Sequence, residues 1–527
     1  MTGPDPDDEP PAELHLTAAE QSLWYACRDS SELDLSTGRL GDDDPTAAEV
    51  RWGPDRHIRG HVIVHLLLRG PTPRMGQAAA VRLKGASVTG AIDLSGADIV
   101  PRLELRDCYL ESPLRLTGSV ADSVHLRRCR IPRLEADGFT SRGSLHVNRC
   151  LLPGGIALQQ AHIGMDLVLT HSVVKGIDPG GRVVSADGLA VAQDVNADGV
   201  TTVGEVSLRG ARIGGDFTMR GSVLHNPGGT ALNAPRITVD HQLVLAPGAD
   251  LDPQTGEPVP AMVRKPRLEG RLCLDGGTFG TLLMLGELPL RSDGMLSLQR
   301  IQTPEFVFTP EPELRDGDWP CRVNVSNAQV GRLRDLPTSW PGIGGLIMGG
   351  FRYETLAPVG RFSLSDRINW VQSGSPEFTP EPYDQLAAVL RADGQESEAD
   401  FVMLTKLRRR RENAPASLKM WEYVQDWTFG YGYRPQRALI WIAMLWCCGS
   451  VVFAHNPPRP LKPGEGPRWD PALYTLDLLL PIVDLGQASA WRPVGFYQIV
   501  ATELIVIGWL LATIVTAGAA KVIFRKS

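Results

Sequence analysis

The sequence predicts a mainly β protein: a parallel β-helix solenoid with an N-terminal helical cap, a helical linker and a C-terminal two-helix transmembrane hairpin. Three observations lead to this fold class. A short pattern of apolar and small residues recurs through much of the chain, two helix-like segments precede its first copy, and two uncharged apolar runs lie near the C-terminus. With 43% hydrophobic and 21% charged residues, the 527-residue chain has the composition of a folded protein with a sizeable core.

The repeated pattern reads apolar-x-apolar-x-x-small-x-apolar. Its copies begin at residues 81, 92, 103, 124, 145, 156, 167, 206, 217, 272 and 323. An apolar-x-apolar step directs two side chains to one face of a short strand, and the small residue marks a corner. Frequent steps of 11 and 21 residues indicate a unit of about 11 residues that is doubled into a coil of about 21. Such units bury their apolar faces only by stacking, so we expect a solenoid.

This repeat resembles that of the pentapeptide-repeat family, whose coils of about twenty residues stack into a right-handed quadrilateral β-helix. The Ala-(Asp/Asn)-Leu signature of that family is approached near residues 90–99, and insertions interrupt the repeat elsewhere. The resemblance implies a right-handed β-helix domain over residues 79–375, with the last coil near residue 355. We expect the Pro- and Gly-rich stretch 246–266 to be a loop or an insertion.

The N-terminal part of the sequence predicts a disordered segment followed by a helical cap on the solenoid. Residues 1–12 are acidic and Pro-rich without the apolar core of a signal peptide, which predicts a disordered segment. Residues 13–78 contain Thr17 and Glu20 at capping-box spacing and a second helical pattern over residues 55–70. We expect these helices to cover the first coil, because the terminal coils of a solenoid need caps.

Two groups of metal-ligating side chains have structural interpretations that we favour over metal sites. The first group would follow one helix face at i, i+4 and i+8 without a further ligand: His57, His61 and His65. The second group occupies the small position of the repeat at intervals of 21 residues: Cys108, Cys129 and Cys150. Free cysteine suits a packed column of small core side chains. The sequence therefore predicts no metal site and no cofactor.

Two apolar runs, residues 438–454 and 504–520, are long enough to cross roughly 25 Å of hydrocarbon as helices. We predict a two-span membrane hairpin over residues 437–527, after a basic helical linker and interfacial elbow over residues 376–436. Lys and Arg are concentrated before the first run and after the second. By the positive-inside rule, we expect both termini and the bulk of the chain on the cytoplasmic side of a bacterial inner membrane.

The elbow contains Thr428-Phe429-Gly430-Tyr431-Gly432, which differs by one residue from the Thr-Val-Gly-Tyr-Gly loop of potassium filters. A filter lies between two spans, whereas this stretch precedes the first run. We therefore interpret it as part of an aromatic belt at the membrane interface. The side chains expected there are Trp421, Trp427, Phe429, Tyr431, Tyr433 and Arg434.

Between the runs, residues 472–495 are too short and too interrupted to span, and both an interfacial and a re-entrant segment remain open. Ionisable residues at membrane depth are candidates for function. Three lie in or near this segment: Asp477, Asp484 and Glu503. An ion- or proton-linked role is one hypothesis, and a position at the level of the lipid headgroups is the other.

The charge distribution limits the classes of partner. A net charge of −7 is too modest to predict nucleic-acid binding. Within the repeats, four basic side chains lie close together in the sequence: Arg127, Arg128, Arg130 and Arg133. We expect this cluster to contact an acidic protein partner or lipid, and we expect membrane lipid to be a partner of the C-terminal segment.

The C-terminal part resembles a module of actinobacterial membrane proteins that place pentapeptide-like repeats before two spans. The resemblance covers residues 383–527 well and residues 13–70 loosely, and it rests on YDQLAAVLRADGQESEADFVMLTKLRRRR, WTFGYGYRPQRAL and LYTLDLLLPIVDLGQ. Proteins of this group are commonly labelled membrane-associated oxidoreductases, without an assigned catalytic residue. The resemblance therefore implies an activity but transfers no site.

No catalytic residue is predicted, because the sequence contains none of the common nucleotide-binding, dinucleotide-binding, hydrolase, dithiol or zinc-protease motifs. Three functions remain open. The leading hypothesis is a membrane-anchored cytoplasmic scaffold that docks a protein partner. The second is a homo-oligomeric membrane effector or channel, and the third is the oxidoreductase that the resemblance implies.

Overall fold

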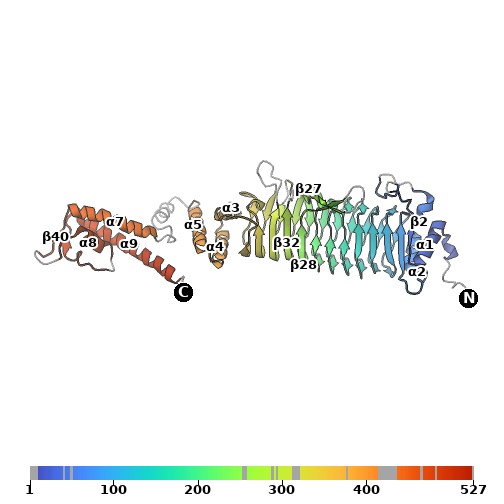
Figure 1. Cartoon of the computed structure of the whole chain (residues 1–527), viewed down its shortest axis with the longest axis horizontal. Coiled ribbons are helices and arrows are strands. Elements are labelled where there is room, and N and C mark those ends of the chain that lie inside the picture. Colours follow the sequence, from blue (N-terminus) through green and yellow to red (C-terminus); the bar gives the residue numbers. More distant parts are fainter. Residues whose placement is uncertain are drawn as a thin grey trace. The chain divides into compact units, whose positions relative to one another are not determined.

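A computed structural model describes most of the chain, and its described residues are 10–39, 42–47, 52–251, 258–286, 290–291, 295–310, 321–374, 378–412, 436–462, 467–480 and 483–524. The chain divides into two compact units, Met1–Pro382 and Tyr383–Ser527. The first unit is a β-solenoid of about 10 turns with parallel sheets, and the second is helical (Figure 1). The solenoid predicted from the repeat is therefore confirmed.

Each early coil contributes short strands to separate faces of the solenoid. The first coil consists of β3 (Ala80–Lys84), β4 (Ser87–Thr89), β5 (Ile92–Asp93) and β6 (Asp98–Ile99). The second repeats this order with β7 (Arg102–Arg106), β8 (Tyr109–Leu110), β9 (Leu114–Arg115) and β10 (Val120–Ala121). Equivalent strands pair in parallel, so Leu83 is in register with Leu105 and Ile92 with Leu114. An inward side chain thus meets its counterpart one coil later.

The same order continues through the following coils, except that in the third coil Arg130 forms only isolated bridges where the second strand would lie. Their strands are β11 (Val124–Arg127), β12 (Leu134–Glu135), β13 (Thr140–Ser141), β14 (Leu145–Asn148), β15 (Leu151–Leu152), β16 (Ile156–Ala157), β17 (His162–Ile163), β18 (Leu167–Val168), β19 (Val173–Val174), β20 (Arg182–Ser185), β21 (Ala190–Val191), β22 (Val195–Asn196), β23 (Thr201–Val203), β24 (Glu205–Ser207), β25 (Arg212–Ile213) and β26 (Phe217–Thr218).

Later strands are longer and bend around the corners of the coil. They are β27 (Val223–Asn233), β28 (Thr238–Leu245), β31 (Arg267–Cys273), β32 (Thr278–Gly286), β33 (Leu290–Arg291), β34 (Met295–Ser297), β35 (Gln302–Pro310), β36 (Arg322–Asn324), β37 (Gln329–Asp335), β38 (Leu346–Ile347) and β39 (Arg352–Leu356). Strand β28, for example, pairs with β25 through Thr238 and with β26 through Leu243. In the predicted insertion, β29 (Gly248–Leu251) and β30 (Pro258–Arg264) form an antiparallel hairpin.

Inward-facing apolar columns form the core, and the three spaced cysteines are one of them. Cys108, Cys129 and Cys150 are at most 2% exposed. The thiol of Cys129 donates to the carbonyl of Leu105 in the preceding coil at 3.4 Å. Burial raises the pKa of the Cys108 and Cys129 thiols well above its ordinary value, so both stay protonated. These cysteines are buried core residues, as their place in the repeat predicts.

The N-terminal cap contains β1 (Glu32–Asp34), β2 (His57–Arg59), α1 (Ala18–Arg28) and α2 (Gly60–Arg69), with 3-10 turns at Ala12–Leu14 and Pro54–Arg56. The predicted capping box is present, because the Thr17 hydroxyl accepts from the Glu20 amide and the Glu20 carboxylate accepts from the Thr17 amide. Both α1 and α2 contact β3, so this cap lies against the first coil.

Helix α2 begins at Gly60, five residues later than the periodicity suggests, because residues 57–59 form a strand that pairs with β4. The prediction that three histidines share one helix face is therefore wrong. His57 lies on β2, whereas His61 and His65 lie on α2, and the His65 ring stacks on Trp24 with the ring centroids 6.1 Å apart. Among the described residues, no group of three or more His, Cys, Asp or Glu could hold a metal ion.

The last coil is closed by a 3-10 turn at Pro337–Ser339 and by α3 (Leu364–Ser373). Arg367 on α3 donates to both carboxylate oxygens of Asp335, at 2.7 and 2.6 Å, and its guanidinium lies 3.6 Å from the centre of the Phe362 ring. The indole of Trp340 donates to the same carboxylate at 2.7 Å. Asp335 is fully buried, and these three hydrogen bonds offset the free-energy cost of removing its carboxylate from water.

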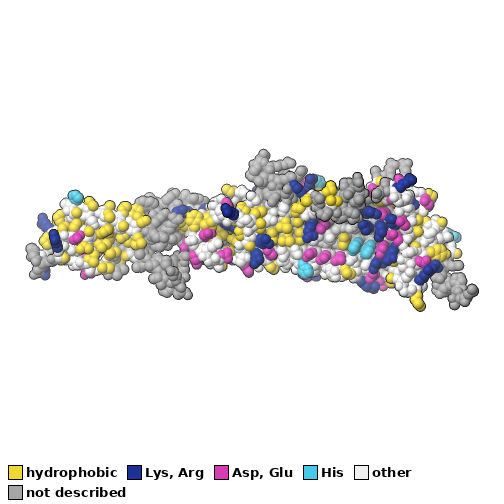
Figure 2. Space-filling view, viewed as in Figure 1, with side chains coloured by type: hydrophobic (Ala, Val, Ile, Leu, Met, Phe, Trp, Pro, Cys, Tyr) yellow, Lys and Arg dark blue, Asp and Glu magenta, His cyan; other side chains and the backbone are white. Residues whose placement is uncertain are grey.

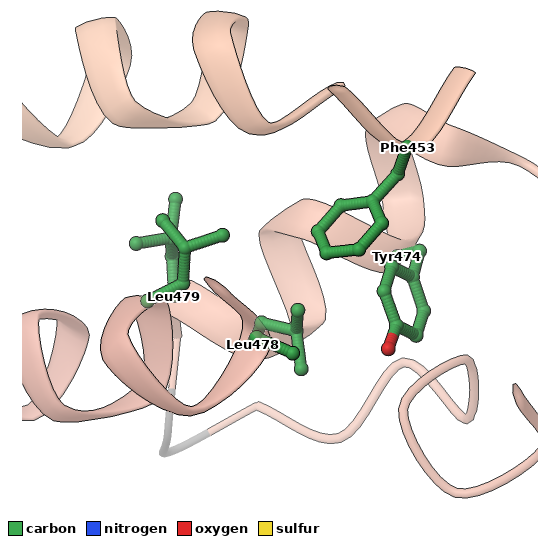
Figure 3. Packing of buried hydrophobic residues seen from close by; sticks show 6 residues of the cluster. Phe453, Tyr474, Leu478 and Leu479 are labelled. Carbon is green, nitrogen blue, oxygen red and sulfur yellow. The ribbon is translucent and has the colours of Figure 1, made fainter. Parts of the chain in front are cut away.

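The second unit is mainly helical, and its first helix, α4 (Glu381–Ala392), begins at the boundary between the units. The other helices are α5 (Glu396–Glu412), α7 (Gln436–His455), α8 (Pro471–Leu479) and α9 (Phe496–Phe524). Two short strands are also present, β40 (Arg459–Pro460) and β41 (Trp491–Arg492). Helices α7, α8 and α9 contact one another around a small apolar core. In Figure 3 the rings of Phe453 and Tyr474 meet at this core, and the two rings are nearly perpendicular with centroids 5.0 Å apart.

The segment predicted to enter the membrane is described only in part. Among the described residues, one helix is long and apolar enough to cross a membrane: α9, through Phe496–Thr513. The apolar part of α7, Leu439–His455, is shorter. Both helices expose large apolar side chains, with Ile440 on α7 67% exposed and Leu510 on α9 59% exposed. The predicted aromatic elbow, including Trp421 and Arg434, lies outside the described residues.

Candidate functional site

The four clustered arginines do not form a single surface, because the chain turns corners between them. Arg127 points outward at the end of β11, and Arg128 occupies the next corner, where it donates to both oxygens of Asp107 at 2.5 and 2.7 Å. Arg130 follows on the next face, with its guanidinium 5.7 Å from the centre of the Tyr109 ring. Arg133 comes after a further turn and donates to the Gly154 carbonyl at 2.6 Å.

A polar pocket of about 330 Å³ lies instead on the face formed by β7, β11 and β14. Its lining includes three guanidinium groups from three consecutive coils, those of Arg106, Arg127 and Arg149. Arg106 and Arg127 are register partners on β7 and β11, and Arg127 is in register with Asn148 on β14. Arg149 follows directly, at the corner. In Figure 2, Lys, Arg and His side chains gather over the first coils of the solenoid, among acidic ones.

Two stacked imidazoles line the same pocket. His125 and His146 are register partners, and their ring centroids are 4.4 Å apart. Burial lowers the pKa of both rings below the ordinary value, and the neighbouring His146 and Arg102 lower that of His125 further, against the opposing effect of Glu104. Asp166 opposes the effect of burial on His146. Both rings are therefore neutral at pH 7, and each can donate one N–H and accept at its other nitrogen.

The acidic residue at the pocket is already neutralised by basic neighbours. Glu104 lies 3.3 Å from Arg82 and 3.6 Å from Arg102, which flank the pocket. Arg106 lies 3.5 Å from Glu32, on β1 of the cap. The pocket thus combines guanidinium forks with neutral imidazole rings on a rigid sheet surface. Such an arrangement can bind an anion, and it offers no nucleophile paired with a base.

The sequence contains a signal for this pocket that a local search for charge clusters misses. Arg106 and Arg127 lie 21 residues apart, as do His125 and His146, and Arg149 lies 22 residues after Arg127. That interval is the coil length, so these side chains meet although they are distant in sequence. Of the four predicted contact residues, only Arg127 lines the pocket.

A second hollow runs along another face, over β13, β17, β21, β25 and β28. This groove has a volume of about 490 Å³ and is lined largely by small and apolar residues, including Ile163, Gly164, Ala192 and Gly214. The glycines are needed because a Cβ at Gly164 would lie 2.3 Å from the Arg142 carbonyl oxygen, and one at Gly214 would lie 2.4 Å from that of Ala192. The groove therefore follows from close stacking of the coils at this corner.

The three ionisable residues predicted near the membrane have different surroundings. Asp477 on α8 is 9% exposed, and its carboxylate accepts hydrogen bonds from the backbone amides of Leu485, Gln487 and Ala488 at 2.7 to 2.8 Å. Asp484 is exposed and accepts from the Gly486 amide at 2.8 Å. Glu503 is exposed on α9. Asp477 thus has a structural role, since these hydrogen bonds hold the backbone of residues 485–488 after α8.

Comparison with protein-family models, with curated proteins and with solved structures gives no match for this chain.

Proposed function

We propose that the protein is a membrane-anchored interaction scaffold, in which the solenoid docks a protein partner and the helices α7 to α9 hold it at a bacterial inner membrane. The observation that carries the proposal is the combination, in one chain, of a β-solenoid of about 10 turns with helices that expose large apolar side chains. A solenoid offers long, rigid faces for binding, and large exposed apolar surfaces mark membrane or protein contacts.

We further propose the handedness of the solenoid, the number of spans and the side of the termini. The solenoid is right-handed, as the resemblance to pentapeptide repeats implies. Helices α7 and α9 both span the bilayer, and both termini are cytoplasmic. Support for two spans comes from their packing: Gly449 on α7 and Gly508 on α9 each approach α8 closely, as small residues do between membrane helices.

The docking test compares two substitutions at equivalent corners of the solenoid. Ala192 follows β21 within the groove, and Val100 follows β6 at the corresponding corner of the first coil. Both are exposed. We expect a partner that purifies stoichiometrically with the wild-type protein from gently solubilised membranes to be retained by Val100→Arg and to be reduced at least about tenfold by Ala192→Arg, which fills the groove.

The same preparation measures the mass of the complex. A partner-free homo-oligomer in the wild-type preparation would contradict the scaffold proposal. Retention of the partner by both variants would keep the scaffold and remove the groove as its docking surface. Circular dichroism of both variants verifies that the solenoid remains folded.

One observation favours a second candidate, an oligomeric membrane effector or channel. Glu503 is exposed on α9 within the stretch Phe496–Thr513 that is apolar enough to cross a membrane. An ionisable side chain at membrane depth needs a protein, water or headgroup neighbour. Ion flux through reconstituted liposomes, abolished by Glu503→Gln, would support this candidate, whereas unchanged flux would count against it.

The oxidoreductase activity implied by the resemblance is tested by nicotinamide- or flavin-dependent turnover.

A further inference from the structure

The polar pocket on β7, β11 and β14 brings together basic side chains from three consecutive coils. Equivalent side chains on neighbouring parallel strands are only about 5 Å apart at the backbone, and like charges in such positions repel. Arg106 and Arg127 are nevertheless register partners, and Arg149 lines the same hollow from the following coil. Three arginines thus line one hollow, and Glu32 lies 3.5 Å from one of them, Arg106.

Arg149 lies at the corner that follows β14. It has a left-handed conformation with φ of 54°, at a corner where the equivalent residue is glycine in some coils, such as Gly85 and Gly199, and is not glycine in others, such as Asp107 and His171. At the equivalent corner one coil earlier, the guanidinium of Arg128 donates hydrogen bonds to both carboxylate oxygens of Asp107. The Arg149 side chain lines the pocket.

The chemistry of the lining selects among anions. Guanidinium groups bind carboxylate and phosphate with paired hydrogen bonds, and several of them around one site favour a multiply charged, three- or four-oxygen anion. The stacked His125 and His146 rings add neutral donors to the wall. A volume of about 330 Å³ holds a phosphate group with a small substituent and is at the lower end of the range for small-molecule sites.

We propose that this pocket binds a phosphate monoester, held by Arg106, Arg127 and Arg149. The phosphate group belongs either to a small soluble molecule or to a lipid headgroup, and both sources present the same dianion. Binding here requires neither a protein partner nor the groove on the other face. Failure of the scaffold proposal and failure of this one are therefore separate outcomes.

The test uses the full chain in nanodiscs of uncharged lipid. Titration calorimetry with glycerol phosphate, and separately with inorganic phosphate, measures the soluble source. Flotation with vesicles of neutral lipid, with and without about 10% phosphatidic acid as the anionic lipid, measures the lipid source. Arg127→Gln and Arg149→Gln each remove one guanidinium from the pocket. Arg115→Gln is the matched control, because Arg115 is an exposed arginine on β9, on a different face, and pairs there with Asp93 and Glu135.

We expect binding in one of the two assays, weakened at least about tenfold by either pocket substitution and changed less than about twofold by Arg115→Gln. Binding in the calorimeter assigns a soluble phosphate ester, and binding only to phosphatidic acid vesicles assigns a lipid headgroup. Equal weakening of binding by all three variants would show that binding depends only on the overall surface charge, and it would overturn the proposal. The absence of binding in both assays by a folded wild-type protein would overturn it as well.

Discussion

At the scale of single residues, an ion pair with a buried carboxylate joins α1 to β2 within the N-terminal cap. At the N-terminal end, Glu20 is fully buried and accepts from the Arg59 side chain at 2.8 and 2.6 Å and from the Arg59 amide at 2.9 Å. Burial by itself would raise the pKa of this carboxyl, but the hydrogen bonds from Arg59 and Thr17 lower it to about 2. The charged form is thus strongly favoured in the folded cap.

This pair predicts a pH-dependent stability of the N-terminal cap. Glu20→Gln should lower the free energy of opening α1 by about 2 kcal/mol at pH 7, because it leaves Arg59 without its counter-charge. The pKa of Glu20 is about 2 in the folded state and near its ordinary value of 4.5 when unfolded. The contribution is therefore complete above pH 4.5 and is lost progressively as the pH falls toward 2.

Hydrogen exchange of the α1 amides, measured at pH 7 and pH 3, checks this expectation. The difference between wild type and Glu20→Gln should be smaller at pH 3. Glu13→Gln is the control, since Glu13 is exposed in the preceding turn and should leave α1 unchanged at both values. A difference that is equal at both pH values would show that the carboxylate charge is not what stabilises the cap.

At the scale of elements, close approach decides how the helices of the second unit pack. A Cβ on Gly508 of α9 would lie 2.5 Å from the carbonyl oxygen of Leu479, at the end of α8. Gly508→Val should therefore push α9 away from α8 and destabilise the unit by about 2 to 3 kcal/mol. Thermal unfolding in detergent checks the effect, and Val506→Leu, on the exposed face of α9, should change the melting temperature little. Equal melting temperatures would contradict this packing.

The elements also show how far the sequence alone reaches. The repeat predicts the solenoid, the small position of the repeat predicts the buried cysteine column, and Thr17 with Glu20 predicts the start of α1. Each of these depends on local pattern or on stacking of like units. The start of α2 was missed because β2 pairs with β4, about 30 residues later, and that tertiary pairing overrides the helical periodicity of residues 57–59.

The polar pocket shows the same limit for a site. Arg127, Arg128 and Arg130 are close in the sequence, yet a corner separates their side chains. Arg106 and Arg127 are a coil apart and meet in one pocket. In a solenoid, contact follows the coil period, so a residue search at intervals of 21 or 22 positions would have found the pocket. The irregular later coils, with strands that bend around corners, weaken that signal toward the C-terminal end.

At the scale of the whole molecule, the two-span proposal predicts which segments face each side of the membrane. Asp393, in the turn between α4 and α5, and Ser489, between α8 and α9, are both exposed. If α7 and α9 both cross the bilayer, these two positions lie on opposite sides. The variants Asp393→Cys and Ser489→Cys each add one exposed thiol to a background in which Cys447 and Cys448 are changed to Ala. They report the side of the membrane directly, because the remaining cysteines are buried or half-buried.

A membrane-impermeant maleimide applied to intact spheroplasts should label Ser489→Cys and leave Asp393→Cys unlabelled until the membrane is permeabilised. The unsubstituted background is the control for labelling of the remaining thiols, of which Cys27, Cys108, Cys129, Cys150 and Cys321 are buried. Labelling of both positions only after permeabilisation would mean that α7 and α9 lie on the membrane or enter it without crossing as a pair. The solenoid would then still be membrane-bound, but its anchor would be interfacial, and Glu503 would lie at the headgroups rather than within the hydrocarbon.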